Sequence, residues 1–273
     1  MHPTPGPAWW TCAVTKEPNP WGIPGYGADT YGESFADVYD DWYSDLPDHD
    51  FIDSIVGALP AHPLRVLELG VGTGRLVRRW RESRSPADSI VGVDTSGAML
   101  DLARSRDRGS GVELVLCDFS RELPPGPFDV VFVGYNTFFN LPDHASMRRC
   151  LRLVADVLAP DGSFHLDAVH PVGTPEGTVT TEMARPDGTT VRSITTHDPA
   201  AQRITGRFVE MNDGRPGRVR EWSVRYATPG QLDEMASSVG LVLASRVADG
   251  RGTPFDDHSA RHVSCWRAAA VSF

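Results

Sequence analysis

A glycine-rich turn bordered by an acidic residue is the part of this sequence whose residue types best suit ligand chemistry. An apolar stretch containing Glu68 ends at Leu69 and continues directly into Gly70-Val71-Gly72-Thr73-Gly74. When such a turn joins a strand to a helix, a ligand can approach the glycine backbone while the helix N-terminus faces it. The pattern therefore predicts a ligand site at the end of a first strand.

The residues around this turn distinguish between two kinds of ligand. Gly70 and Gly72 match the start of the dinucleotide fingerprint G-x-G-x-x-G/A, but its last position holds Arg75, which would obstruct close helix–strand packing. Glu68 would place a negative charge near a pyrophosphate, which is electrostatically unfavourable. A ligand that carries an ammonium and a sulfonium group suits this acid better than a nicotinamide dinucleotide does.

Two further acids follow the next two apolar stretches. Asp94 lies 20 residues after Gly74, where a carboxylate can accept hydrogen bonds from both hydroxyls of a ribose. Asp118 is followed by Phe119, so an acid there can accept from an exocyclic adenine amine while apolar groups cover the ring. One such acid is typical of a solvated strand end, but three at successive strand ends indicate a ligand-binding edge.

Alternating apolar strands and helical segments position these residues. They predict parallel βαβ units that cross over with right-handed connections and carry helices on both sheet faces. Strands are predicted at 66–69, 90–93, 112–116, 128–133 and 163–169. Residues 33–59 have the apolar spacing of two helices separated by Pro47.

The pattern changes after Pro171. Residues 177–226 contain alternating runs rich in Thr, Arg and Val that are separated by turn sequences, which predicts an antiparallel meander of three or four strands. A helix is predicted at 229–239, followed by two closing strands. The chain therefore combines an α/β body with a β insert.

Charge and cysteine content exclude several functional classes. The 273 residues carry a formal charge of −10, and residues 1–64 hold ten acids against one lysine. An acidic chain lacks the basic footprint of a protein that binds nucleic acid or an anionic membrane surface. The four cysteines are far apart and show no metal-ligand spacing, so we expect no metal site and a reducing, cytoplasmic location.

The motifs together resemble the class I S-adenosylmethionine-dependent methyltransferases. The resemblance covers about residues 31–171 and includes the glycine turn, the Asp94 and Asp118 segments and the strand at 128–131. It implies an α/β fold with a doubly wound, mostly parallel, seven-stranded Rossmann-like sheet and an inserted antiparallel β-meander. The expected regions are an irregular extension (1–30), a helical cover (31–64), the S-adenosylmethionine-binding core (65–171), the insert (172–228) and a closing helix with two strands (229–273).

The resemblance also implies roles for individual residues in binding the methyl donor. Glu68 and the three glycines would hold the methionine part, and Asp94, with Thr95 beside it, the ribose. Met99 would pack on adenine, and Asp118 and Phe119 would bind its edge and face. Tyr135 and Asn136, which end the fourth strand, would lie beside the reacting methyl group.

By the same resemblance, the acceptor would lie between the N-terminal helices, the segment after the fourth strand and the insert. An aromatic box suits a sulfonium and an amine-bearing acceptor. Burial in the core is the alternative for each aromatic candidate. We predict catalytic positions for Tyr31, Tyr39 and Phe139, and substrate contacts for Tyr43, Asn136 and Phe138.

His170, which follows the fifth strand, is the best candidate for a general base, because an imidazole titrates near neutral pH. A structural, hydrogen-bonding histidine is the alternative. The stretch Tyr135-Asn136-Thr137-Phe138 lacks the Asp-x-x-Tyr and Asn-Pro-Pro-Tyr arrangements of the adenine-N6 and glutamine methylating subfamilies. A small-molecule acceptor is therefore favoured.

The N-terminal aromatic stretch and the insert resemble those of actinobacterial natural-product tailoring methyltransferases that act on amines of aminosugar or lincosamide intermediates. The first functional hypothesis is accordingly amine methylation. The alternatives are O- or C-methylation of a small molecule with His170 as base, an NAD-dependent oxidoreductase, and a non-enzymatic S-adenosylmethionine binder. The exposed edge of the predicted meander suggests a homo-oligomer contact.

Overall fold

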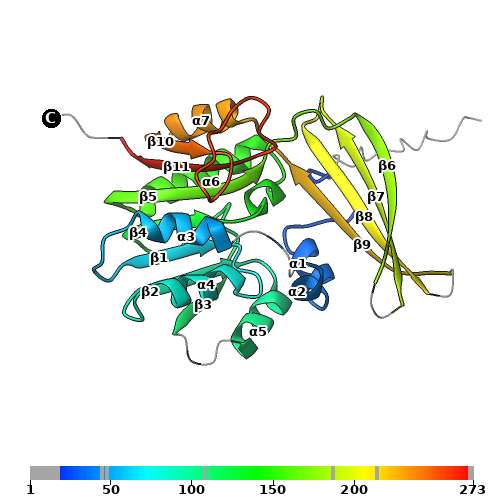
Figure 1. Ribbon diagram of the computed structural model, residues 1–273, viewed down its shortest axis with the longest axis horizontal. Coiled ribbons are helices and arrows are strands. Elements are labelled where there is room, and N and C mark those ends of the chain that lie inside the picture. Colours follow the sequence, from blue (N-terminus) through cyan, green and yellow to red (C-terminus); the bar gives the residue numbers. More distant parts are fainter. Residues whose placement is uncertain are drawn as a thin grey trace, which may run out of the picture.

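Two β-sheets of different construction form this protein (Figure 1). The computed structural model describes residues 19–43, 46, 49–106, 109, 111–185, 188–212 and 215–269. The larger sheet has seven strands in the order β10-β11-β5-β4-β1-β2-β3, and the smaller has four in the order β6-β7-β8-β9. In the larger sheet only β11 runs against its neighbours. The predicted mostly parallel, seven-stranded α/β fold is confirmed.

Alternation along the central strands builds a separate core on each sheet face. The strands of the larger sheet are β1 (Arg65–Leu69), β2 (Ser89–Asp94), β3 (Val112–Leu116), β4 (Phe128–Val133), β5 (Leu158–Val169), β10 (Leu241–Val247) and β11 (Arg261–Ala268). Val66 and Phe132 face one core while Leu67 and Val133 face the other, because successive strand side chains point to opposite faces.

Helices cover both faces, as a doubly wound sheet requires. The helices of the body are α3 (His49–Gly57), α4 (Arg75–Ser83), α5 (Gly97–Arg106), α6 (His144–Val157) and α7 (Pro229–Ser237). Residues of α3 and α4 pack into one core, and residues of α6 and α7 pack into the other. No helix among the described residues is long and apolar enough to cross a membrane.

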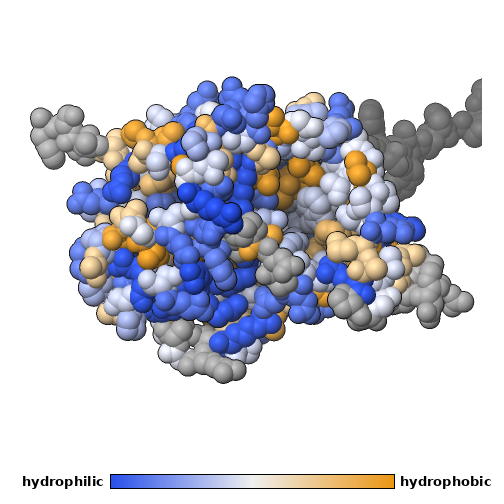
Figure 2. Space-filling view, in the orientation of Figure 1, coloured by the Kyte–Doolittle hydropathy of each residue, from blue (hydrophilic) through white to orange (hydrophobic). Residues whose placement is uncertain are grey.

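The insert between β5 and α7 is a four-stranded antiparallel meander, as predicted. Its strands are β6 (Gly177–Ala184), β7 (Thr190–Asp198), β8 (Arg203–Asn212) and β9 (Arg215–Arg225). In Figure 1 this sheet stands apart from the larger one, with α1 (Thr30–Phe35) and α2 (Tyr39–Trp42) between the two. On the face shown in Figure 2, hydrophilic side chains dominate the α/β body and apolar ones form small groups.

The first predicted N-terminal helix is divided into α1 and α2, which corrects the single helix expected before Pro47. Phe35 and Trp42 both pack edge-on against Phe208 of β8, with ring centroids 5.9 and 5.3 Å apart. Between them, Asp37 accepts hydrogen bonds from Arg220 of β9 at 2.7 and 3.0 Å. These contacts with the insert stabilise two short helices in place of the single helix that the apolar spacing predicts.

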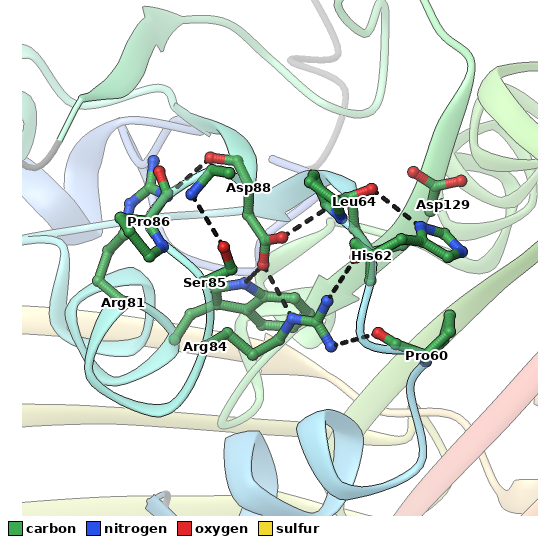
Figure 3. A network of polar contacts seen from close by, with 12 residues as sticks. Pro60, His62, Leu64, Arg81, Arg84, Ser85, Pro86, Asp88 and Asp129 are labelled. Carbon is green, nitrogen blue, oxygen red and sulfur yellow. Dashed lines mark hydrogen bonds and ion pairs between the residues drawn. The ribbon is translucent and has the colours of Figure 1, made fainter.

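The end of the sheet away from the glycine turn is fastened by a buried carboxylate, Asp88 (Figure 3). It accepts hydrogen bonds from the Leu64 backbone at 3.0 Å, from Trp80 Nε1 at 2.8 Å and from Arg84 Nε at 2.9 Å. Arg84 also donates to the carbonyls of Pro60 and His62. This network joins the N-terminal ends of β1 and β2 to α4 and serves the fold.

Candidate active site

The glycine turn at the carboxyl end of β1 has the backbone that its sequence predicts. Gly70, Gly72 and Gly74 all have left-handed φ values, of +71°, +53° and +81°. A Cβ atom at Gly70 would lie 2.2 Å from Thr137 Cγ2, so any larger residue there would collide. The Gly72 N–H donates to Asp94 Oδ2 at 2.8 Å, which joins the turn to the end of β2.

Glu68 is a buried carboxylate that fits the ammonium group of a methionyl ligand. Its side chain points into a small pocket lined also by Tyr39, Arg75, Tyr135 and Thr137. Oε2 has no hydrogen-bond partner among the described residues. Burial raises the pKa of Glu68 well above its usual value, and the neighbouring Asp94 charge raises it further. A cationic ligand group would satisfy this carboxylate, since an unpaired buried charge is costly.

A cavity of about 340 Å³ extends from this turn along the carboxyl ends of the strands. Its volume falls at the lower end of the range for small-molecule sites. The structure brings together most of the residues predicted to bind the donor, together with two of the predicted catalytic tyrosines. The shared wall contains Gly70, Gly72, Asp94, Thr95, Met99, Asp118, Phe119, Tyr31 and Tyr39.

The two strand-end acids in the cavity are held by local hydrogen bonds. Asp94 accepts from the backbone of Gly72 and of Ser96, while burial raises its pKa above the usual value. Asp118 accepts from the backbone and hydroxyl of Ser120 at 2.9 and 2.7 Å, and Arg121 Nε lies 3.1 Å from its second oxygen. These bonds fix the orientation of both carboxylates at the cavity wall, and their contacts with ribose and adenine stay predictions.

Four tyrosines form a cluster beside the glycine turn. Tyr31 and Tyr39 line the cavity and Tyr135 lines the Glu68 pocket, whereas Tyr43, a predicted substrate contact, lines neither. The Tyr31 hydroxyl donates to that of Tyr43 at 3.0 Å. The ring of Tyr39 lies 6.5 Å from that of Tyr31, and the ring of Tyr135 lies 6.4 Å from that of Tyr43. Burial raises the pKa of all four phenols, so they are neutral near pH 7.

The predicted residues Phe138 and Phe139 lie in the core instead of on the cavity wall. Both are fully buried, and they belong to the 3-10 helix η1 (Thr137–Asn140). Phe138 packs against Phe164 of β5. Tyr135 and Asn136, in the turn after β4, have left-handed φ values of 40° and 63°. This turn leads the chain into η1 so that both phenylalanine rings lie in the core.

Asn136 and His170 also make structural contacts. Asn136 Oδ1 accepts the Val169 N–H at 2.7 Å, which ties the turn after β4 to β5. His170 Nδ1 lies 3.1 Å from the Ser259 carbonyl, and the ring packs near Phe255. Neither residue lines the cavities around the glycine turn. Gly74, which was predicted to bind the donor, does not line them either and forms the N-cap of α4.

Two residues of this region were not predicted as site residues from the sequence. Trp21, in the segment expected to be an irregular extension, lines the cavity. Arg261 of β11 forms an ion pair with the buried Asp167 and lies over the Tyr135 ring at 5.9 Å. For Trp21, the sequence left open that the N-terminal tryptophans pack onto the domain, but it predicted no cavity contact; no local pattern marked Arg261.

Comparison with known proteins identifies the family. A methyltransferase domain model matches residues 66–162. The structure of the CcbJ methyltransferase from Streptomyces caelestis is 33% identical, covers 90% of this chain and 100% of that chain, and has a TM-score of 0.80. The structure of the sugar N-methyltransferase KedS8 from a Streptoalloteichus species is 16% identical, covers 84% and 93% of the two chains, and has a TM-score of 0.64.

Among curated proteins, a demethylmenaquinone methyltransferase of Thermus thermophilus is 33% identical over 108 residues, or 38% of this chain and 47% of that protein. The chain spans less than half the length of the curated relatives that it matches. The sheet order, the glycine turn and the strand-end acids define the class I methyltransferase fold and its donor site. This chain belongs to the class I S-adenosylmethionine-dependent methyltransferases, and S-adenosylmethionine is its cofactor.

Proposed function

We propose that this protein methylates an amine nitrogen of a small molecule, an intermediate of natural-product biosynthesis. The observation that carries the proposal is the composition of the cavity wall beside the glycine turn. Neutral tyrosines line it, and no histidine or lysine does so among the described residues. Its carboxylates, Asp94, Asp118 and Asp143, already accept backbone hydrogen bonds. An amine that arrives unprotonated needs no general base, whereas a hydroxyl acceptor usually does.

S-adenosylmethionine supplies an electrophilic methyl group, and the chain's own residues align and desolvate the reaction. Methyl transfer is an in-line displacement in which a positive charge disperses, so proximity and a dry pocket are the main requirements. The acceptor nitrogen donates its lone pair to the methyl carbon, the carbon–sulfur bond breaks with its electrons left on sulfur, and the nitrogen then loses a proton to water. Tyr31 and Tyr39 would surround the cationic centre with aromatic rings.

The names of two similar proteins support this acceptor class. KedS8 is described as a sugar N-methyltransferase, and the structurally similar CalS10 as an amino pentose methyltransferase. We therefore infer that the acceptor carries an amine, with aminosugar or lincosamide-type compounds as the first candidates.

Mass spectrometry of candidate acceptors incubated with methyl-labelled cofactor tests the proposal. A panel of matched secondary amines and alcohols should show label on nitrogen alone, with a rate that rises as pH approaches the pKa of the amine. Label on hydroxyl or carbon acceptors alone would contradict it. The His170→Ala variant should keep near-wild-type rates, whereas loss of turnover would favour O- or C-methylation with His170 as base.

We also propose that the insert forms a contact between copies of this chain through β6. This edge strand is exposed along nearly its whole length, and Val179 and Met183 are 55% and 50% exposed. Unpaired edges of this kind associate readily. Light scattering should show an oligomer that the Val179→Glu/Met183→Glu variant dissociates, and a monomeric wild-type protein would contradict the idea.

A further inference from the structure

One wall of the donor cavity comes from a segment far outside the region that carries the family motifs. Residues 19–28, here called the N-terminal strap, precede α1 and lie upstream of the matched residues 66–162. Pro20, Trp21 and Ala28 line the same cavity as Asp94, Met99 and Asp118. The strap runs between the two sheets at the start of the coloured chain in Figure 1.

The strap crosses the cavity and is attached on both sides of it. At one end, the Thr95 hydroxyl donates to the Ala28 carbonyl at 3.0 Å, beside the predicted ribose carboxylate. Near the other end, Trp21 Nε1 donates to the Asn140 carbonyl at 2.8 Å, in the segment that follows β4. The strap therefore spans from the end of β2 to the loop after β4.

The insert supplies a latch for this strap. Arg203 of β8 donates through Nη2 to the Pro20 carbonyl at 2.7 Å and to the Pro142 carbonyl at 3.1 Å. Its Nη1 donates to Ser223 Oγ at 3.1 Å, and that hydroxyl donates to the Trp21 carbonyl at 2.6 Å. One guanidinium thus joins the strap, the insert and the loop after β4.

Arg203 is a partly buried guanidinium that holds the strap through hydrogen bonds, and it is not part of a surface ion pair. Burial lowers its pKa, with the Arg225 charge lowering it further. Among the described residues it forms no ion pair with a carboxylate, and its hydrogen bonds go to neutral oxygens. Removing charge-assisted bonds of this kind should release the strap, since each is stronger than a neutral hydrogen bond.

We propose that Trp21 is a donor-contacting residue and that Arg203 is the positioning residue that holds it over the bound donor. The inference rests on the proposed function, because it assumes a methyl donor in this cavity. A cavity of about 340 Å³ is small enough that a ligand filling it touches both walls. Because the indole N–H already bonds to the Asn140 carbonyl, Trp21 would contact the donor through the carbon atoms of its ring. Exchange of donor and product then requires the strap to lift.

Calorimetry and stopped-flow displacement with S-adenosylhomocysteine test this proposal on the full chain. Trp21→Ala and Arg203→Met should each raise the Kd about tenfold and increase the release rate by a similar factor. Arg203→Lys, which can still donate to Pro20, should recover part of the affinity. Arg207→Met is the matched control, because Arg207 is exposed on the same strand and does not line the cavity.

Thermal melting of each variant separates release of the strap from unfolding. Kd values and release rates within twofold of wild type for both Trp21→Ala and Arg203→Met would overturn the proposal. That result would leave the proposed amine methylation untouched, because the wild-type protein would still bind S-adenosylhomocysteine. Conversely, if both variants show the expected rise in Kd but no amine is labelled, only the proposed amine acceptor is refuted. A wild-type protein that binds no S-adenosylhomocysteine would refute both the strap proposal and the proposed function.

Discussion

Arg261 forms a two-armed ion pair with Asp167 directly beside the turn that carries Tyr135. Asp167 is fully buried at the end of β5, and both of its carboxylate oxygens accept from the guanidinium. The Asp167 backbone carbonyl accepts the Asn136 N–H at 3.1 Å. The pair therefore braces two consecutive left-handed residues, Tyr135 and Asn136, against β5.

Removing Arg261 should strongly destabilise the protein. An Arg261→Met variant leaves the Asp167 carboxylate buried without its charged partner, which costs about 3–5 kcal/mol in the free energy of unfolding. Denaturant unfolding measures this loss. The double variant Asp167→Asn/Arg261→Met should be more stable than Arg261→Met alone, and an Arg261→Met variant within about 1 kcal/mol of wild type would show that the ion pair does not brace the turn.

Replacement of Glu68 by Gln should weaken donor binding. The variant keeps the shape of the side chain but loses the charge that an ammonium group would meet, so the Kd for S-adenosylhomocysteine should rise about tenfold or more, as expected for a lost charge-assisted bond. Calorimetry provides the measurement, with Glu82→Gln on the exposed side of α4 as the control. Equal affinities of the two variants for S-adenosylhomocysteine would show that the ammonium group of the ligand does not bind at Glu68.

The pH dependence of stability in the ligand-free protein should also report on Glu68. Its folded-state pKa is raised above the unfolded value of about 4.3, so the native state holds this proton more tightly. The resulting contribution is present below the unfolded pKa and is lost as pH rises toward the folded pKa. Wild-type protein should therefore lose stability relative to Glu68→Gln across that interval, and parallel curves would count against the raised pKa.

Asp88 should have the opposite pH dependence. Burial opposes its ionisation, but hydrogen bonds from Trp80, Arg84 and Leu64 leave its pKa below the usual value. Its contribution is therefore present above the unfolded pKa of about 3.9 and is lost as pH falls through the folded pKa. Asp88→Ala should cost about 3 kcal/mol near neutral pH, because Arg84 loses a buried partner.

Two measurements complete the Asp88 test. Denaturant unfolding between acidic and neutral pH should show that the Asp88→Ala variant loses less stability on acidification than wild type does. Affinity for S-adenosylhomocysteine should stay unchanged, because Asp88 lies away from the glycine turn. The exposed Asp101→Ala variant is the control, expected within about 0.5 kcal/mol of wild type. A similarly small effect for Asp88→Ala would mean that the network contributes little.

A methyl group at Gly70 should disrupt the donor site. Gly70→Ala places a Cβ atom 2.2 Å from Thr137 and requires alanine at a φ of +71°, so we expect a loss of about 1–3 kcal/mol and little donor binding. Gly57→Ala, where a Cβ would meet nothing within 4 Å, should be neutral or slightly stabilising. Melting curves and calorimetry measure the stability and the donor affinity of both variants. Equal values for Gly70→Ala and Gly57→Ala would show that the turn relaxes to accommodate the methyl group.

The sequence alone determined the fold class and the cofactor, and it predicted the sheet edge at which the donor binds. The glycine turn, Asp94 and Asp118 all follow apolar strands, and parallel strands place their carboxyl ends at one edge whatever the details of packing. Local pattern and topology were therefore sufficient for the cofactor, and the comparisons confirm the family. The antiparallel insert, predicted with three or four strands and observed with four, likewise followed from alternation and turn residues.

Only the tertiary structure decided what surrounds that edge on the acceptor side. Phe138 and Phe139 enter the core because of the left-handed turn at Tyr135, which no local pattern announces. Trp21 reaches the cavity through bonds to Asn140 and Ser223, 119 and 202 residues away. Such contacts join segments that are distant in the chain, so their energies depend on the assembled fold and are absent from local sequence periodicity.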